Sequence, residues 1–153
     1  MWSGLNHIQL SRCAEYCAQL EFASRGYEVQ PGSGGALFLA QNPADGQTYE
    51  VRVKSSRNLN YAFIQKDKME LAPHRLVCLL LFEDGKMPDC YLIPSLAWKN
   101  PGLLLVSRDF GKAGQTSKPE WGINLSQKNM PLLQMYRADA FFEQAQRINA
   151  GDR

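Results

Sequence analysis

Long apolar runs are what this sequence most clearly lacks. The longest are RLVCLLLF at 75–82 and GLLLVS at 102–107, whereas a helix that spans a bilayer needs roughly 20 apolar residues. The N-terminal segment MWSGLNHIQLSRC also lacks the charged-then-apolar order of a signal peptide. We therefore expect no membrane partner and a cytoplasmic protein, and the two runs are suited to buried strands.

A strong charge of either sign is also missing. The 17 lysines and arginines nearly balance 15 aspartates and glutamates, which leaves a net charge of +2 and a pI near 8.4. Bulk charge therefore does not indicate a nucleic-acid binder, although a local basic patch is compatible with this total. With 153 residues, 44% of them hydrophobic, the chain suits one globular domain over 1–153.

Cysteine and histidine, the usual zinc ligands, are scarce. The cysteines are Cys13, Cys17, Cys78 and Cys90. Cys13 and Cys17 lie one helical turn apart, where a disulfide is geometrically awkward, and no second Cys or His pair stands at ligand spacing. We expect reduced, packed thiols and no metal bound to them. His7 and His74 have no nucleophile motif nearby and are interpreted as surface residues.

The hydrophobic pattern predicts a helix towards each end of the chain. Apolar residues recur at intervals of three and four over 6–24 and over 131–148, which is typical of amphipathic helices, and Gly26 suits the end of the first. A short helix is expected to start at Pro94 and Ser95. We interpret 55–74 as a polar loop, in which Tyr61 and Phe63 alternate with basic residues.

Strands are expected between the helices. A hairpin is predicted from an apolar run and an alternating run that flank a DG turn. The expected strand segments are 25–29, 36–40, 48–54, 75–85, 88–95 and 102–107. We interpret SKPEWG at 117–122 as a fixed turn, and Trp98 and Trp121 as packing anchors. This order indicates a mixed α/β (α+β) fold with one sheet.

The stretch TYEVRVKSS at 48–56 has the strongest functional pattern. Its alternation places Glu50, Arg52 and Lys54 on one face of a strand. A face meant only for burial would carry apolar residues, so this row indicates the rim of a site. The basic and aromatic residues that follow suit a nucleic-acid groove or an ordinary solvated loop.

These segments resemble the PD-(D/E)XK nuclease superfamily and, within it, a bacterial family of small domains of unknown function. The resemblance covers nearly the whole chain. The segments that carry it are NHIQLSRCAEYCAQLEFASRGYEV, YEVRVKSSRNLNYAF, LFEDGKMPDCYLIPSLAWKNP and SKPEWGINLSQKNMPLLQMYR. It implies a restriction-endonuclease-like fold, with a central mixed sheet flanked by helices. It also implies a nuclease-type site where the first helix meets the hairpin, with Mg²⁺ or Mn²⁺ if the site is active.

Only part of the family motif is present. Glu15 matches the helix glutamate of the family, Lys54 the motif lysine and Ser55 the small polar residue after it. The motif aspartate is expected within 35–37, where no acid stands, and the position two before the lysine is Arg52. Mg²⁺ requires several oxygen ligands, and a guanidinium beside the ion repels it. Glu15 alone should therefore hold no catalytic metal.

The charges of the motif strand have several expected partners. We expect Glu15 to form an ion pair with Lys54 or Arg52, and Glu50 to contact Arg52 or Lys54. Arg52 has one further expected partner, a phosphate from outside the protein. Alternatively, Glu50 replaces the missing acid and supports an active site made of Glu15, Glu50 and Lys54.

The sequence is therefore compatible with three functions. The first is a catalytically inactive nuclease-like domain that binds DNA or a protein partner. Its predicted nucleic-acid-binding residues, beside Lys54, are Arg52, Ser55, Arg57, Lys66 and Lys68. The second is a Mg²⁺- or Mn²⁺-dependent endonuclease that uses Glu15, Glu50 and Lys54. The third is a structural interaction module that forms a homodimer or binds another protein.

Overall fold

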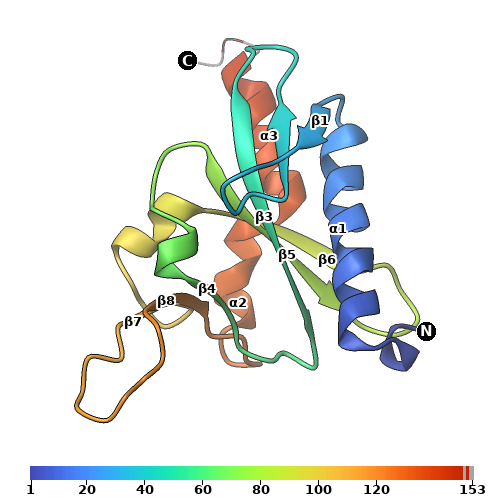
Figure 1. Cartoon of the computed structure of the whole chain (residues 1–153). Coiled ribbons are helices and arrows are strands. Elements are labelled where there is room, and N and C mark those ends of the chain that lie inside the picture. Colours follow the sequence, from blue (N-terminus) through green and yellow to red (C-terminus); the bar gives the residue numbers. More distant parts are fainter. Residues whose placement is uncertain (150, 152–153) are drawn as a thin grey trace.

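A five-stranded mixed sheet is the centre of the fold (Figure 1). The protein is described here by a computed structural model that covers residues 1–149 and 151. In spatial order the strands are β1 (Glu28–Pro31), β2 (Phe38–Gln41), β3 (Thr48–Arg57), β5 (Arg75–Phe82) and β6 (Asp89–Pro94). β3 and β5 are parallel, and all other neighbours are antiparallel. The predicted hairpin and the predicted 75–95 strand pair are confirmed.

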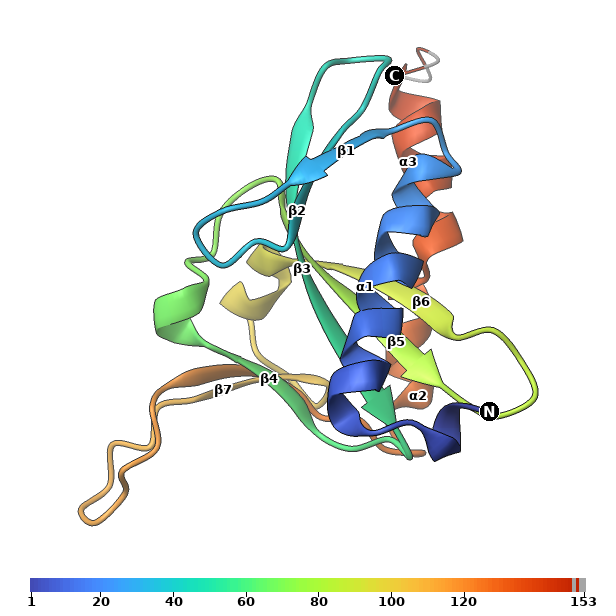
Figure 2. The same ribbon diagram turned by 45° about the vertical axis from the view of Figure 1, so that its right-hand side comes forward.

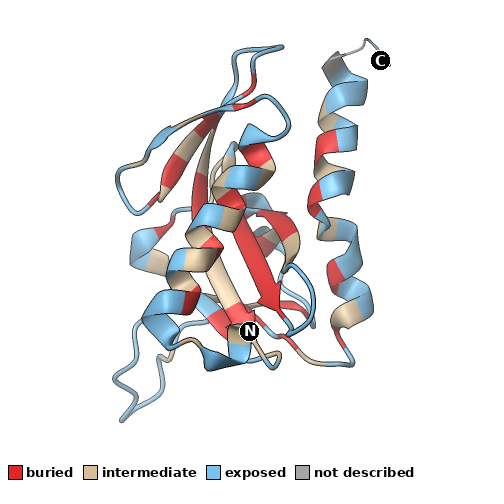
Figure 3. Ribbon diagram, turned by 90° about the vertical axis from the view of Figure 1, so that its right-hand side faces the viewer, coloured by how far each residue is buried: buried red, intermediate tan, exposed pale blue. Residues whose placement is uncertain are grey.

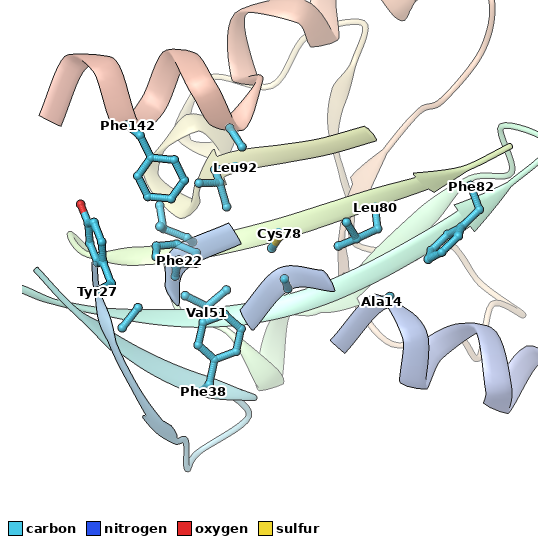
Figure 4. Close-up of a cluster of buried hydrophobic side chains, with 14 of the residues drawn as sticks. Ala14, Phe22, Tyr27, Phe38, Val51, Cys78, Leu80, Phe82, Leu92 and Phe142 are labelled. Carbon is cyan, nitrogen blue, oxygen red and sulfur yellow. The ribbon is translucent and has the colours of Figure 1, made fainter. Parts of the chain in front are cut away.

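Two helices cover one face of this sheet (Figure 2). α1 (His7–Ala23) begins at a capping box, in which Asn6 and Gln9 satisfy each other's backbone N–H groups. Its buried residues recur every four positions and pack on the sheet together with α3 (Ala138–Asn149). Figure 4 shows Phe22 of α1 between Phe142 of α3 on one side and Phe38 on the other, and its ring contacts both. The helix-side core fixes the position of α1 beside β3.

A second, three-stranded antiparallel sheet covers the opposite face. Its strands are β4 (Ala62–Gln65), β8 (Glu120–Ile123) and β7 (Leu105–Arg108), in the order β4-β8-β7. Ile64 and Ile123 from this sheet bury Val77 and Leu79 of β5. Trp98 is fully buried in the same core, and its indole N–H donates to the Gly122 carbonyl at 2.9 Å. Figure 3 shows buried residues concentrated in the central strands, whereas the helices alternate between buried and exposed.

Short helical segments connect these layers. They are η1 (Trp2–Gly4), η2 (Lys66–Lys68), η3 (Ser95–Lys99), α2 (Met130–Leu133) and η4 (Gln134–Tyr136). The single helix predicted over 131–148 is wrong, because the chain leaves helical geometry at Arg137. This residue is extended (φ −54°, ψ 140°) and forms a β-bridge with Tyr91 of β6. Pairing with the sheet has overridden a continuous amphipathic pattern.

Two predicted irregular segments are strands instead. β3 runs on to Arg57 and β4 forms within the predicted 55–74 loop, while β8 begins inside the predicted turn at 117–122. Ala62 and Ile64 are buried and Phe63 between them is exposed, so the strand pattern exists but is only four residues long. The mixed α/β (α+β) class is confirmed, with two sheets in place of one. In the part of the chain that the structure describes, no helix is long and apolar enough to cross a membrane.

Candidate phosphate-binding site

β3 has strand neighbours on both sides only at residues 50 and 51, and along its second half it has a neighbour on one side. β2 pairs with residues 48–51, whereas β5 pairs with residues 50–57. The Val51 carbonyl accepts a bond from Leu37 on the β2 side, and the Glu50 N–H donates to His74 on the β5 side. By strand alternation, the backbone groups of residues 53, 55 and 57 point to the side without a strand. Within residues 1–149 this leaves an open sheet edge between α1 and β4.

Two pockets lie along the open edge. The arginine pocket, of about 500 Å³, is lined by Glu15, Gly35, Ala36, Leu37, Arg52, Val53, Lys54, Phe63, Ile64, Gln65 and Lys68. The helix pocket, of about 420 Å³, lies along the first half of α1 and is lined on the β3 side by residues 53–57. Glu15, Val53, Lys54 and Phe63 line both pockets. The two hollows therefore meet at Lys54 and Phe63.

The prediction that Glu50, Arg52 and Lys54 share one face of β3 is confirmed. Arg52 is in register with Val77 and Lys54 with Leu79, and both of these β5 residues belong to the core beneath the small sheet. The row therefore points away from the layer formed by α1 and α3. Glu15 reaches the same pockets from α1, around the open edge.

Arg52 is a buried guanidinium whose hydrogen bonds are incomplete. The residue is 5% exposed, and it donates from Nε to the Lys68 carbonyl at 3.3 Å and from Nη2 to the Gly34 carbonyl at 3.2 Å. Its Nη1 is buried without a hydrogen-bond partner. Burial lowers the pKa of Arg52, and the nearby Glu50 opposes that shift. The predicted ion pairs of Arg52 with Glu15 or Glu50 are wrong, because two backbone carbonyls hold the guanidinium instead.

The glycine-rich segment before β2 lies against this guanidinium. Gly35 has φ +92°, a conformation that favours glycine, and a side chain there would meet the Lys68 carbonyl at 2.9 Å. The Cβ position also lies 3.6 Å from Arg52 Nη2. The GSGG sequence therefore lets the backbone pass directly over Arg52.

Lys54 is a half-buried ammonium at the junction of the two pockets. Among the described residues, no hydrogen bond or ion pair engages it, and burial lowers its pKa. The predicted pair between Glu15 and Lys54 is wrong, because Glu15 binds Arg12, one helical turn earlier, at 3.3 Å. The lysine charge is therefore left for contacts outside the protein.

The three residues predicted as catalytic do not converge. Glu15 and Lys54 line the same pockets, but Glu50 lines neither and its carboxylate binds Arg75 Nε at 3.1 Å. The predicted contact of Glu50 with Arg52 or Lys54 is therefore wrong. Glu15 is the one carboxylate that lines the two pockets, and residues 1–149 contain no group of three or more His, Cys, Asp or Glu side chains placed to hold a metal ion. These donors do not fit a Mg²⁺ or Mn²⁺ site.

The predicted nucleic-acid-binding residues divide into two groups. Lys68 lines the arginine pocket beside Arg52, and Ser55 lines the helix pocket. Arg57 also lines the helix pocket, but its Nη1 donates to the Trp2 and Leu5 carbonyls at 2.6 and 2.9 Å. The Lys66 ammonium lies 2.6 Å from Asp109 and 4.2 Å from the centre of the Trp121 ring. Arg57 and Lys66 are therefore engaged within the protein.

An aromatic pair stands beside the basic residues. Phe63 is 43% exposed, and its ring stacks on Tyr61 with centroids 6.0 Å apart and planes 20° apart. The Tyr61 hydroxyl donates to Glu120 at 2.5 Å, and the Arg108 guanidinium lies 4.3 Å from the ring centre. Burial, followed by the bond to Glu120, raises the Tyr61 pKa. The alternation of basic and aromatic residues indicated this groove, but nothing in the sequence indicated the contribution of Arg108 from a distant strand.

The cysteines belong to the helix-side core, away from the pockets. All four are free thiols, as predicted, although Cys78 and Cys90 bring their sulfurs to 3.4 Å across β5 and β6. Burial raises the pKa of Cys17. The hydrogen bond to Cys90, together with burial, also raises the pKa of Cys78, so Cys17 and Cys78 ionise less readily than a free thiol.

Comparison of the chain with family models, with curated proteins and with solved structures found no match.

Proposed function

We propose that this protein is a non-catalytic, nuclease-like domain that binds nucleic acid by holding a backbone phosphate in the arginine pocket. One observation carries the proposal: buried Arg52 and half-buried Lys54 lie side by side, and neither forms an ion pair with a carboxylate of residues 1–149. Charges removed from water are normally paired, since an isolated buried charge is strongly unfavourable. An external anion would supply the missing partner.

The residues of the arginine pocket suit a phosphate. Lys54 and Lys68 line it and can contact phosphate oxygens directly, while Arg52 adds positive potential from beneath the surface. The one lining carboxylate, Glu15, already binds Arg12. A phosphate would therefore meet three cations and little repulsion.

The resemblance to nucleases supports a phosphate ligand for this pocket. In a nuclease site, carboxylates hold a metal ion that attracts the phosphate, and here Arg52 occupies a position where the family has an acid. The arginine replaces the charge of a metal ion without its ability to activate water. The endonuclease alternative has less support because Glu50 binds Arg75 and lines neither pocket.

Fluorescence anisotropy with labelled oligonucleotides tests the proposal. We expect binding at about 50 mM salt that weakens about tenfold at about 200 mM, as for two or three phosphate contacts. Lys54→Ala should reduce the affinity about tenfold, which corresponds to one charge-assisted contact of about 1.4 kcal/mol. Lys99→Ala is the matched control, because this exposed lysine lines neither pocket and its removal lowers the net charge equally.

Three outcomes would reject the proposal. They are no binding at low salt, binding without salt dependence, or equal losses in the Lys54 and Lys99 variants. The same oligonucleotides incubated with Mn²⁺ should remain intact. Cleavage that disappears in Lys54→Ala would establish the endonuclease in place of the binding domain.

A further inference from the structure

We infer that the nucleic acid recognised here is a single strand, with one base stacked on Phe63 while an adjacent phosphate occupies the arginine pocket. This inference rests on the proposed function and adds the class of ligand. The observation behind it is the aromatic pair of Tyr61 and Phe63, whereas the proposed phosphate binding depends on Arg52, Lys54 and Lys68.

Phe63 occupies a position where its ring can meet a ligand. It lies on β4, an edge strand of the small sheet, between two buried residues, so its side chain points to the outer face of that sheet. Phe63 is 43% exposed and lines both pockets, as Lys54 does. A base on Phe63 and a phosphate near Lys54 would therefore be neighbours.

Neighbouring side chains in and beside the small sheet also hold the Phe63 ring in place. Tyr61 stacks on it, Glu120 fixes the tyrosine hydroxyl, and Arg108 lies over the tyrosine ring. β8 contributes Gly122 opposite Phe63, where any side chain would collide with the Tyr61 ring. The sheet leaves room for the aromatic stack at this position. A preordered ring loses little freedom on binding, which favours stacking with a ligand.

Stacking on Phe63 selects single strands. In a duplex each base is already stacked and paired, whereas the unstacked bases of a single strand can lie on an aromatic side chain. Each such contact is sequence-tolerant because every base has a π-face. The arginine and helix pockets, of about 500 and 420 Å³, are in the usual size range of ligand sites. The shared chemistry is a nucleobase next to a phosphate, present in both DNA and RNA.

The direct test compares three probes of equal length: oligo-dT, an abasic oligomer with the same phosphates, and a DNA duplex. We expect oligo-dT to bind about tenfold more tightly than the other two at low salt, a typical effect of one stacked base. Oligo-rU serves as the RNA arm. Binding of oligo-rU equal to oligo-dT assigns the site to single strands in general, and a preference for either assigns it to that nucleic acid.

Substitutions at Phe63 link the effect to this ring. Phe63→Leu should lower the oligo-dT affinity to that of the abasic oligomer, while Phe63→Trp should retain it. Leu103→Ala, at another exposed apolar residue, is the control and should change the affinity less than twofold. An unchanged thermal midpoint in Phe63→Leu would show that the fold is intact.

The outcomes separate this inference from the proposed function. Equal affinity for oligo-dT, abasic oligomer and duplex would overturn the stacking inference and leave phosphate binding in place. Absence of binding to all of them at low salt would overturn both. Oligo-dT binding that survives Phe63→Leu unchanged would also overturn the inference.

Discussion

Two arginines on one strand, Arg52 and Arg57, show how differently the protein uses the same side chain. Nη1 of Arg57 forms two short bonds, of 2.6 and 2.9 Å, to the carbonyls of Trp2 and Leu5. Arg52 forms two long bonds, of 3.2 and 3.3 Å, and leaves its own Nη1 without a partner. Arg57 thus connects the N-terminal segment to β3, while the hydrogen bonds of Arg52 are incomplete and no carboxylate of residues 1–149 forms an ion pair with it.

The pockets beside the two arginines differ in the number of carboxylates that line them. Arg57 also lines a hollow of about 650 Å³, larger than the arginine pocket, but Glu83, Asp84 and Asp89 line that hollow too and would repel a phosphate. The arginine pocket is smaller and contains one carboxylate. Uncompensated positive charge, and not volume, therefore distinguishes the arginine pocket from the larger hollow.

The largest effect on stability is expected from Arg57→Met. This change removes two short charge-assisted bonds, to the Trp2 and Leu5 carbonyls, a loss of about 2–3 kcal/mol, although the Trp2 carbonyl keeps its bond from the Leu5 N–H. Urea unfolding should show this as a lower midpoint. Oligonucleotide affinity of the folded fraction should fall less than in Lys54→Ala, because Arg57 is engaged within the protein. Stability equal to wild type would show that the N-terminal segment does not depend on Arg57.

A smaller loss is expected from the same substitution at the other arginine. Arg52→Met removes two long bonds but also removes a buried charge without a partner, and these effects offset each other to within about 1 kcal/mol. The affinity for oligonucleotides should nevertheless fall, although less than in Lys54→Ala, because the buried Arg52 acts on the phosphate only through its positive potential. A destabilisation larger than that of Arg57→Met would reverse the comparison and make Arg52 a structural residue.

Local features of β3 and α1 could be predicted from the sequence, whereas the partners of their charged side chains could not. Alternation alone placed Glu50, Arg52 and Lys54 on one face of β3, and helical spacing alone predicted α1, because both patterns are local. The partners of these charges depend on distant segments. Glu50 forms an ion pair with Arg75 on the parallel neighbour β5, and Arg52 donates hydrogen bonds to the carbonyls of residues 34 and 68. The nuclease resemblance predicted that Lys54 is a functional residue. The open sheet edge beside Lys54 could not be predicted, because it depends on β2 pairing only with residues 48–51 of β3.

The smallest effect, and one of opposite sign, is expected at Lys54. Lys54→Met removes a half-buried ammonium without a partner and keeps a side chain of similar length. The unfolding free energy of the variant should rise by about 0.5–1 kcal/mol. This gain is smaller than the usual range for fully buried charges, because Lys54 is partly exposed. Lys99→Met, at an exposed lysine, should leave stability nearly unchanged.

The pH dependence of this gain identifies its cause. Burial lowers the pKa of Lys54 in the folded protein below the ordinary value of 10.5, so the unfolded state binds more protons between these two pKa values. The cost of burying the ammonium is complete below the folded pKa and disappears as the pH rises towards 10.5. The advantage of Lys54→Met over wild type should therefore be largest near neutral pH and shrink in alkali. Tyr27, whose pKa burial raises to about 12, is present in both proteins and cancels in the difference. An advantage that stays constant up to pH 10.5 would attribute the gain to packing and would weaken the assignment of an uncompensated charge at Lys54.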